Sequence, residues 1–402
     1  MLSMGLIAVG NGLLFAFVPV KLAAEGFAPW VAGAILTALS VGGLAGCLLT
    51  GPLVRRVGHA RVFATYAAVV ILSILLIAAG TEPALWIVSR GLYGLSAAGL
   101  FIVSQSWLND ASPNEWRGKV IAAFYMIYVL AIGAGSYLLS YVSLDGAQAP
   151  LLAIFFAAIA ILPVGLTRLP APPPPEAVHV AVRAVWRISP VGLVGLLSVG
   201  GLTMLVQGFA PIYAAAEGYS KNEIALLMFL MQFGMIAVQY PLGAISDRTD
   251  RRYVLIAAAL LVIASAAVAT QISGMALVWL ILVFAVWGGA TESIYAVANA
   301  HANDRAEPQY YVSLSSTLLV AWSVSGVILP ALATVLTQVA GPRAFMLVAM
   351  VVAMLFAVFV TYRLTRREAV AETDQEPYQA ISAQAPLTAE LSPQPSGEQQ
   401  AD

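Results

Sequence analysis

The chain has 402 residues, of which 60% are hydrophobic and 10% are charged, and its net charge is −1. Ordinary soluble domains carry about 25% charged residues, so this composition excludes a typical water-soluble globular protein. The near-zero charge gives no indication of a nucleic-acid partner, and the single cysteine, Cys47, excludes a disulfide within the chain.

Apolar stretches that can cross a bilayer, which takes about 20 residues each, recur through the chain. The first begins almost at Met1 without a basic segment or a small-residue cleavage site, so we interpret it as a retained helix rather than a signal peptide. The sequence predicts an all-α membrane protein with twelve transmembrane helices, at 2–20, 29–52, 60–80, 84–107, 120–142, 149–167, 191–214, 222–245, 253–272, 275–299, 312–337 and 344–363.

The two halves of the chain resemble each other. Residues 17–63 and 209–255 align without a gap, and each contains a hydrophobic span, an Ala-Glu-Gly loop, a second span and a basic loop. The recurring residues include Phe17, Pro19, Glu25, Gly42 and Gly51, which match Phe209, Pro211, Glu217, Gly234 and Gly243. Such a repeat in a membrane chain indicates a transporter in which one half rocks against the other around a central site.

Lysine and arginine lie mostly on one side of the predicted spans. With the amino terminus in the cytoplasm, 15 of them fall in inner loops and ends, and only Lys21, Lys221 and Arg343 fall in outer loops. This is a strong positive-inside bias. It predicts a multi-pass protein of the bacterial inner (plasma) membrane with both termini in the cytoplasm.

The composition changes after the sixth span and again after the twelfth. Residues 168–190 contain Pro170 and a run from Pro172 to Pro175, which is typical of an extended spacer. From Glu368 to Asp402 the chain has seven acidic and no basic side chains, and too few apolar groups to fold alone. We therefore predict a first six-helix bundle at 1–167, a cytoplasmic linker at 168–190, a second six-helix bundle at 191–363 and a disordered acidic tail at 364–402.

The basic loops after the second and eighth spans resemble the signature of the major facilitator superfamily, Gly-x-x-x-Asp-Arg-x-Gly-Arg-Arg. The second-half loop has Asp250 in place of the second glycine, and the first-half loop has Arg55 in place of the aspartate. The signature residues that remain are Gly51, Arg56, Gly58, Arg61, Gly243, Asp247, Arg248, Arg251 and Arg252. The resemblance implies two pseudo-symmetric six-helix bundles.

In this superfamily the signature aspartate locks the cytoplasmic gate, because a carboxylate can face the positive amino end of a helix in the other half. The lock would then depend on Asp247, meeting the helix that begins near Arg117. Asp110, Asp304 and Arg305, at the inner ends of the fourth and tenth spans, are added to the predicted gate. The alternative is that these charges only hold the loops in the cytoplasm.

Only Arg90 and Glu292 are charged residues well inside predicted spans. A charge there costs about 2.5–3.5 kcal/mol or more, so it normally faces a cavity or a partner. Because a buried carboxyl group can take up and release a proton, Glu292 is predicted to couple protons or to contact the substrate. Arg90 begins the sequence RGLYG, which resembles a superfamily pattern linked to proton coupling. The alternatives are a hydrogen-bonded structural glutamate and an arginine that reaches the outer interface.

Uncharged polar residues accompany these two charges. In the superfamily's fold the first, fourth, seventh and tenth helices line the central cavity. The resemblance therefore implies that the cavity is lined by Asn11, Arg90, Gln105, Gln207, Glu292 and Tyr295. The alternative is that each of them only holds neighbouring helices together.

The segment from Glu292 to Arg305, ESIYAVANAHANDR, is similar to a segment of the YcaD-like branch of the superfamily. NEWRGKV from Asn114 and GPRAFM from Gly341 fit this branch too. The resemblance covers nearly the whole chain apart from the acidic tail. It implies a transporter and gives little about the substrate.

Motifs for other chemistry are absent from the sequence. It has no phosphate-binding loop and no metalloprotease or serine-hydrolase motif. Its three histidines lie far apart, so we predict no enzyme activity, no cofactor and no metal site. The fifth span lacks the Gly-Pro-x-x-Gly-Gly pattern of drug–proton antiporters, which disfavours drug efflux.

The sequence thus predicts a secondary active transporter that moves a small solute across the lipid bilayer by rocker-switch alternating access. We expect it to be coupled to protons and to act as a monomer. Symport, antiport and uniport are open alternatives, as are import and export of a solute of either charge or none. A transporter-like receptor or scaffold that binds without transport is the rival from another class, and a membrane-embedded enzyme is the third.

Overall fold

The computed structural model describes residues 1–166, 179–271, 274, 276–341 and 343–368 and, in the tail, 370, 375, 378 and 381. Within these residues every regular element is a helix. Twelve of the helices are long and apolar enough to cross a membrane. Each corresponds to one predicted span, with ends that differ by up to several residues, which confirms the predicted all-α membrane fold.

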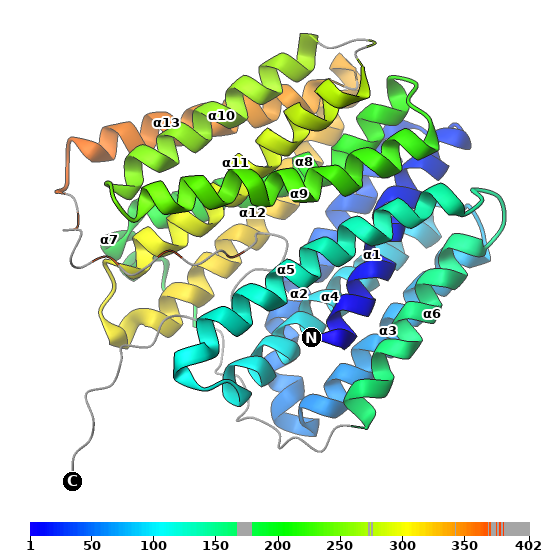
Figure 1. Ribbon diagram of the computed structural model, residues 1–402, viewed down its shortest axis with the longest axis horizontal. Coiled ribbons are helices and arrows are strands. Elements are labelled where there is room, and N and C mark those ends of the chain that lie inside the picture. The colour runs from blue at the N-terminus through cyan, green and yellow to red at the C-terminus, as the bar shows by residue number, and fades with distance from the viewer. Residues whose placement is uncertain are drawn as a thin grey trace.

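Two six-helix bundles make up the fold (Figure 1). The first contains α1 (Leu2–Ala24), α2 (Pro29–Val57), α3 (His59–Ala79), α4 (Pro83–Ala111), α5 (Asn114–Leu138) and α6 (Gln148–Gly165), with the short helix η1 (Leu139–Tyr141) after α5. The second contains α8 (Pro190–Ala216), α9 (Lys221–Ser246), α10 (Arg251–Gln271), α11 (Leu277–Asn303), α12 (Tyr311–Ala340) and α13 (Ala344–Leu364). Two short helices, α7 (Val182–Ile188) and η2 (Pro308–Tyr310), precede α8 and α12. The whole proline run of the predicted linker and most of the predicted tail lie outside the described residues.

Both bundles contain very close contacts between helix backbones, and one such contact in each bundle joins a corresponding pair of helices. A Cβ atom added to Gly12 of α1 would lie 1.9 Å from the carbonyl oxygen of Ile132 in α5, and one added to Gly200 of α8 would lie 1.9 Å from that of Trp322 in α12. Because lipid removes the hydrophobic drive for helix association, close packing over small residues replaces it. The repeat seen in the sequence is therefore also a repeat of packing.

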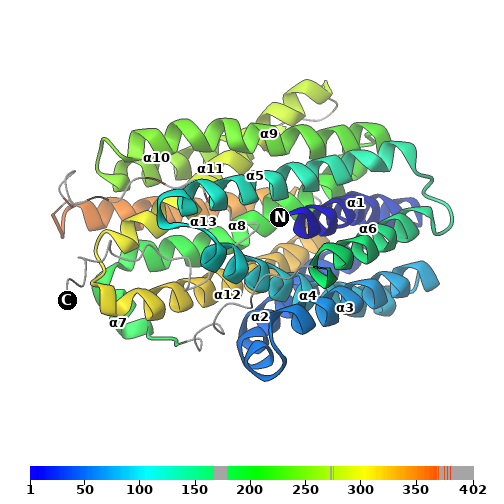
Figure 2. The same cartoon turned by 60° about the horizontal axis from the view of Figure 1, so that its bottom comes forward.

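The bundles meet at one end and separate toward the other. We call the end that carries the loops with Arg56, Arg117 and Arg248 the basic end, and the other the opposite end. At the opposite end Lys221 Nζ donates to the carbonyl oxygen of Val142 across the two bundles at 2.6 Å. Figures 1 and 2 show the helices of both bundles converging there and diverging toward the basic end.

The contact at the opposite end is tight as well as polar. A Cβ atom on Gly33 of α2 would overlap the side chain of Thr334 in α12, 1.6 Å from its Oγ1. One on Gly208 of α8 would lie 2.6 Å from the Leu36 side chain of α2. These approaches between bundles show that the opposite end is closed.

Candidate functional site

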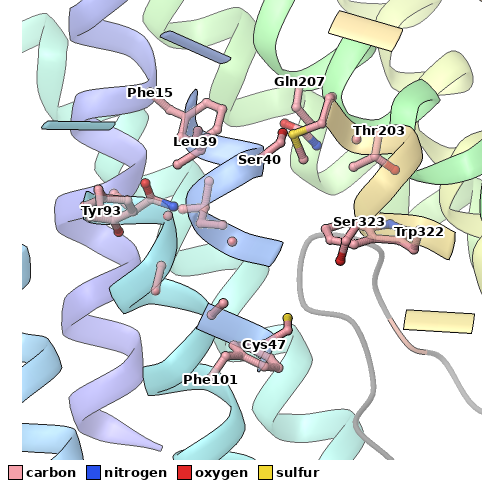
Figure 3. A pocket seen from close by; sticks show the side chains of 18 of the residues that line it. Phe15, Leu39, Ser40, Cys47, Tyr93, Phe101, Thr203, Gln207, Trp322 and Ser323 are labelled. Carbon is pink, nitrogen blue, oxygen red and sulfur yellow. The ribbon is translucent and has the colours of Figure 1, made fainter. Parts of the chain in front are cut away.

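A cavity of about 140 Å³ lies between the two bundles. Helices α1, α2, α4 and α5 line it from the first bundle, and α8, α9 and α12 line it from the second. Figure 3 shows Phe15, Tyr93 and Phe101 on one side, with Thr203 and Trp322 on the other. Because both bundles contribute walls, any movement of one against the other changes the shape of the cavity.

The cavity wall is aromatic and polar but uncharged. Tyr128 adds to the aromatic side chains, and Asn11, Ser40, Gln207 and Ser323 add to the polar ones. Among the described residues that line the cavity there is no Asp, Glu, Lys or Arg. Such a wall fits the usual make-up of small-molecule sites, which are mostly apolar with a few placed polar groups.

Several polar atoms on the cavity-lining residues lack a hydrogen-bond partner. Asn11 Oδ1, Thr203 Oγ1 and Trp322 Nε1 are buried and have no hydrogen-bond partner among the described residues. Gln207 differs, since its Nε2 donates to Met235 Sδ at 3.1 Å and its Oε1 accepts from Gln232 Nε2 at 3.3 Å. Buried polar groups are nearly always hydrogen-bonded in proteins, so the orphaned ones indicate a ligand or water.

Arg90 is buried, at 3% exposed, behind this wall. Its guanidinium lies over the rings of Phe15, 5.4 Å from the centroid, and of Tyr93, at 4.7 Å. It lines a second, smaller cavity near Leu36 and Gly208, on the side of the opposite end. Its Nη1 has no hydrogen-bond partner in the part of the chain that the structure describes. Arg90 therefore supports two cavity residues without lining the central cavity.

The structure brings Asn11 and Gln207 together in the central cavity and places the other predicted lining residues outside its wall. Glu292 is buried within α11, at 3% exposed. Tyr295, one turn later, lines a small cavity with Asn299 and Leu319. Gln105 is also buried, and its Nε2 donates to the Tyr125 hydroxyl at 2.7 Å. The central cavity takes further residues from α1, α4 and α8, as the resemblance implied, and also from α2, α5, α9 and α12, which the resemblance did not indicate.

The second-half gate residues form a buried ionic network at the basic end. Arg251 Nε donates to Asp304 Oδ2 at 2.6 Å and Arg251 Nη2 to Asp304 Oδ1 at 3.3 Å, and both side chains are 1% exposed. Arg251 Nη1 also reaches Asp247 Oδ1 at 3.5 Å. This fork ties the start of α10 to the end of α11 and holds Asp247 beside them.

Asp250, which stands where the superfamily signature has glycine, starts α10. It accepts hydrogen bonds from the backbone N–H of Arg252 at 3.0 Å and from Arg252 Nη2 at 2.6 Å. Burial favours its neutral form, but these hydrogen bonds outweigh burial and hold the pKa of Asp250 below its ordinary value. The departure from the signature thus supplies a helix cap.

The remaining predicted gate residues of this half lie around that network. Arg248 is exposed, whereas Arg252 is buried and donates through Nη1 to the carbonyl oxygen of Arg367 at 2.7 Å. Arg305 Nη2 donates to the carbonyl oxygen of Glu368 at 2.8 Å. Burial and the nearby Arg367 and Arg252 lower the pKa of Arg305 to about 10. The gate of this half is therefore tied to the start of the tail.

The first-half gate residues are far less connected. Arg56, Arg61 and Asp110 are exposed and Gly51 is half-buried. Gly58 ends α2 at φ +83°, a conformation that glycine adopts without strain. Arg117 bonds within its own half, through Nε to the carbonyl oxygen of Asn109 at 3.2 Å. Among the described residues Asp247 contacts Arg251 and Tyr378 of the tail, and the predicted contact with the helix that starts near Arg117 is not formed in this state.

Sequence reasoning missed two parts of this site. The aromatic wall, with Tyr93, Tyr128 and Trp322, carries no signal that distinguishes it from ordinary apolar span residues. Arg251 belongs to the recognised signature, but the sequence does not tell which arginine binds Asp304. Arg251 and Arg252 are both buried, and only the hydrogen bonds of the structure show that Arg251 is the partner.

Comparisons with known proteins agree with this architecture. The profile of the Major Facilitator Superfamily matches residues 1–220 and 191–395. An uncharacterised MFS-type transporter of Enterobacter sp. (strain 638) is 26% identical over 340 residues, which cover 83% of this chain and 86% of the relative. The uncharacterised MFS-type transporter YcaD of Shigella flexneri serotype 5b is 25% identical over 342 residues, with 83% and 86% covered.

Solved structures show the same fold. A mutant of the nucleoside transporter NupG superposes with a TM-score of 0.71 at 13% identity, covering 90% of this chain and 100% of that one. The human organic anion transporter MFSD10 gives 0.62 at 17% identity, covering 89% and 97%. With the family profile matched in both halves, and with relatives similar along most of its length, this chain belongs to the Major Facilitator Superfamily and resembles its YcaD-type members.

Proposed function

We propose that this protein is a secondary active transporter that moves a small solute by rocking its two bundles around the central cavity. The observation that carries the proposal is the cavity itself, which both bundles line and which is closed at the opposite end. A transporter must expose such a site to one side at a time. With the basic end in the cytoplasm of a bacterial inner membrane, as the arginine bias favours, the structure is an inward-facing state with both termini inside.

The basic end is the proposed cytoplasmic gate. Asp247 lies at the end of α9, and the Arg251–Asp304 fork holds it in place. In the outward-facing state its carboxylate would meet the amino end of α5, where a helix dipole favours negative charge. Arg56, Arg61 and Asp110 are exposed here and become available for contacts when the bundles close.

Glu292 is the proposed proton carrier. It is buried in a membrane-spanning helix, where the ionised form of a carboxyl group is costly in free energy and the protonated form is favoured. Arg90 is proposed as a positioning residue, because its guanidinium stacks on two aromatic residues of the cavity wall. In this proposal the protein acts as a monomer and has no enzyme activity. The rival is a receptor of the same fold that binds its solute and does not move.

Distance measurements between the bundles test this proposal. After Cys47→Ser, spin labels at positions 60 and 253 report the basic end, and labels at positions 28 and 339 report the opposite end; all four positions are exposed. In lipid nanodiscs at acidic and at alkaline pH we expect each pair to show two distances, changing in opposite directions. One fixed distance at each end would favour the receptor, and parallel changes would contradict alternating access.

A further inference from the structure

The central cavity also indicates what kind of solute it takes. The described residues that line it include no charged side chain that could pair with an ionic solute. The buried cation Arg90 lies behind Phe15 and Tyr93. Bringing a charged group into such a place costs several kcal/mol unless it is paired. The wall therefore selects against ions of either sign.

The polar atoms of the wall select a particular pattern of hydrogen bonding. Asn11 Oδ1 can only accept a hydrogen bond, and Trp322 Nε1 can only donate one. The two residues lie on opposite bundles, and neither atom has a partner among the described residues. A solute that offers both an N–H donor and a carbonyl acceptor would satisfy both residues after small side-chain rotations, and it would bridge the bundles.

We propose that the transported solute is a small uncharged molecule with a flat aromatic body that carries both a hydrogen-bond donor and an acceptor, as in a carboxamide. This deepens, and rests on, the transporter function proposed above. The aromatic side chains give the flat body stacking surfaces, and a cavity of about 140 Å³ limits its size.

A series of isosteric probes tests this class by binding alone. Benzamide is neutral, benzoate is its anionic counterpart and benzamidine its cationic one. We expect benzamide to raise the melting temperature of the purified protein in a concentration-dependent way, and the two ions to have no effect. Trp322→Phe removes the indole donor and should weaken benzamide binding about tenfold, whereas Trp186→Phe on α7 should leave it unchanged.

Equal or stronger stabilisation by benzoate or benzamidine would overturn the assignment, and so would no stabilisation by any of the three. Because melting reports binding without transport, this result is separate from the distance measurements. Benzamide binding with immobile bundles would keep the solute class and reject the transporter. If the bundles move but the protein binds only benzoate or benzamidine, the transporter function stands and the proposed solute class is rejected.

A second, independent observation concerns the tail. The backbone N–H of Tyr378 donates to Asp247 Oδ1 at 2.9 Å. Gln239 Nε2 donates to the carbonyl oxygen of Ile381 at 2.6 Å. Both partners belong to α9 or its end, and they are separated by two turns, or about 12 Å. These tail residues therefore follow α9 inward from the basic end.

Of the two tail residues, Ile381 is buried and Tyr378 is half-buried. Ile381 is 4% exposed. The Tyr378 ring lies on Gly243, where an added Cβ atom would be 2.2 Å from its Cε1. Burial and the nearby Glu292 and Asp247 carboxylates raise the pKa of the Tyr378 hydroxyl. The tail thus covers the signature glycine, the signature aspartate and the surroundings of the proposed proton carrier together.

We infer that the segment with Tyr378 and Ile381 is a tethered inhibitor that docks on the second-half gate and holds the basic end open. While Asp247 accepts the N–H of Tyr378, and Tyr378 and Ile381 lie against α9, the two bundles cannot close on each other there. Release of the segment would free Asp247 for the first bundle and allow the next half-cycle.

Two truncated chains test the inhibitor. A chain that ends at Asp374 lacks both docking residues, and a matched control that ends at Pro386 keeps them. For the shorter chain we expect about tenfold more of the state with a short 60–253 distance, the scale set by two hydrogen bonds, and a correspondingly faster benzamide exchange in liposomes. The control should behave as the full chain does. Identical distance distributions in both truncated chains would overturn the inference, whatever their transport rates.

Discussion

Replacing Asp304 with alanine is expected to lower the free energy of unfolding by about 3–5 kcal/mol, the usual cost of leaving one partner of a buried ion pair alone. Both side chains of the Arg251–Asp304 pair are 1% exposed, so the arginine left behind has no access to water. Arg251 Nη1 also contacts Asp247 Oδ1 at 3.5 Å and Ser246 Oγ at 3.3 Å, but these longer contacts do not replace a two-point fork. Urea unfolding in detergent micelles, followed by tryptophan fluorescence, measures the loss.

The chain offers a matched control for this variant. Asp110 is the symmetry mate of Asp304 at the end of α4, but it is exposed, so Asp110→Ala should change the free energy of unfolding by less than about 0.5 kcal/mol. The double variant Arg251→Met, Asp304→Leu removes both charges and should recover most of the loss. Equal effects of the two alanine variants would show that the pair contributes nothing beyond a surface charge.

Replacing Glu292 with glutamine is expected to abolish solute accumulation driven by a pH gradient, so that the solute reaches equal concentrations on both sides of a liposome membrane. Glutamine keeps the size and hydrogen-bonding capacity of the side chain but cannot take up or release a proton. Exchange of solute across the membrane without a gradient should continue, because it needs only the rocking of the two bundles. Radiolabelled benzamide uptake and counterflow, measured on the same vesicles, separate the two activities.

Glu82→Gln is the control for this second variant, since Glu82 is an exposed residue of the loop before α4. It should accumulate benzamide as the parent does. If Glu292→Gln accumulates it equally well, with the same pH dependence, Glu292 is not the proton carrier. If the variant loses counterflow as well as accumulation, its role is structural rather than coupling.

The fold could be predicted from the sequence because a membrane leaves few solutions for the backbone. Every backbone N–H and C=O in a span must bond within the helix, so long apolar runs become helices with little dependence on tertiary context. The repeat of residues 17–63 at 209–255 then predicted the division into two bundles. The helix ends were less certain: α5 begins at Asn114, well before its apolar run, because polar residues also continue a helix beyond the bilayer core.

The cavity could be predicted only in part. Asn11 and Gln207 stood out because polar residues are rare in spans, and the structure places both in the wall. Phe15, Tyr93 and Trp322 did not stand out, because an aromatic residue inside a span has the same sequence signal whether it faces lipid, another helix or a cavity. Glu292 and Tyr295 lie on the tenth span as the resemblance required, but no described residue of α11 lines the central cavity. The placement of a helix in its bundle depends on packing between neighbours, which a single sequence does not display.

Ile132 and Trp322 occupy a position with a mechanical consequence. Each presents its side chain to the central cavity, while its carbonyl oxygen lies at the glycine contact that joins two helices of its own bundle. A solute that displaces either side chain therefore acts directly on one of the closest helix–helix contacts of that bundle. Because close-packed joints transmit strain instead of absorbing it, the load passes to the bundle as a whole. Through these two side chains, one in each bundle, a small ligand can therefore move both bundles as rigid units.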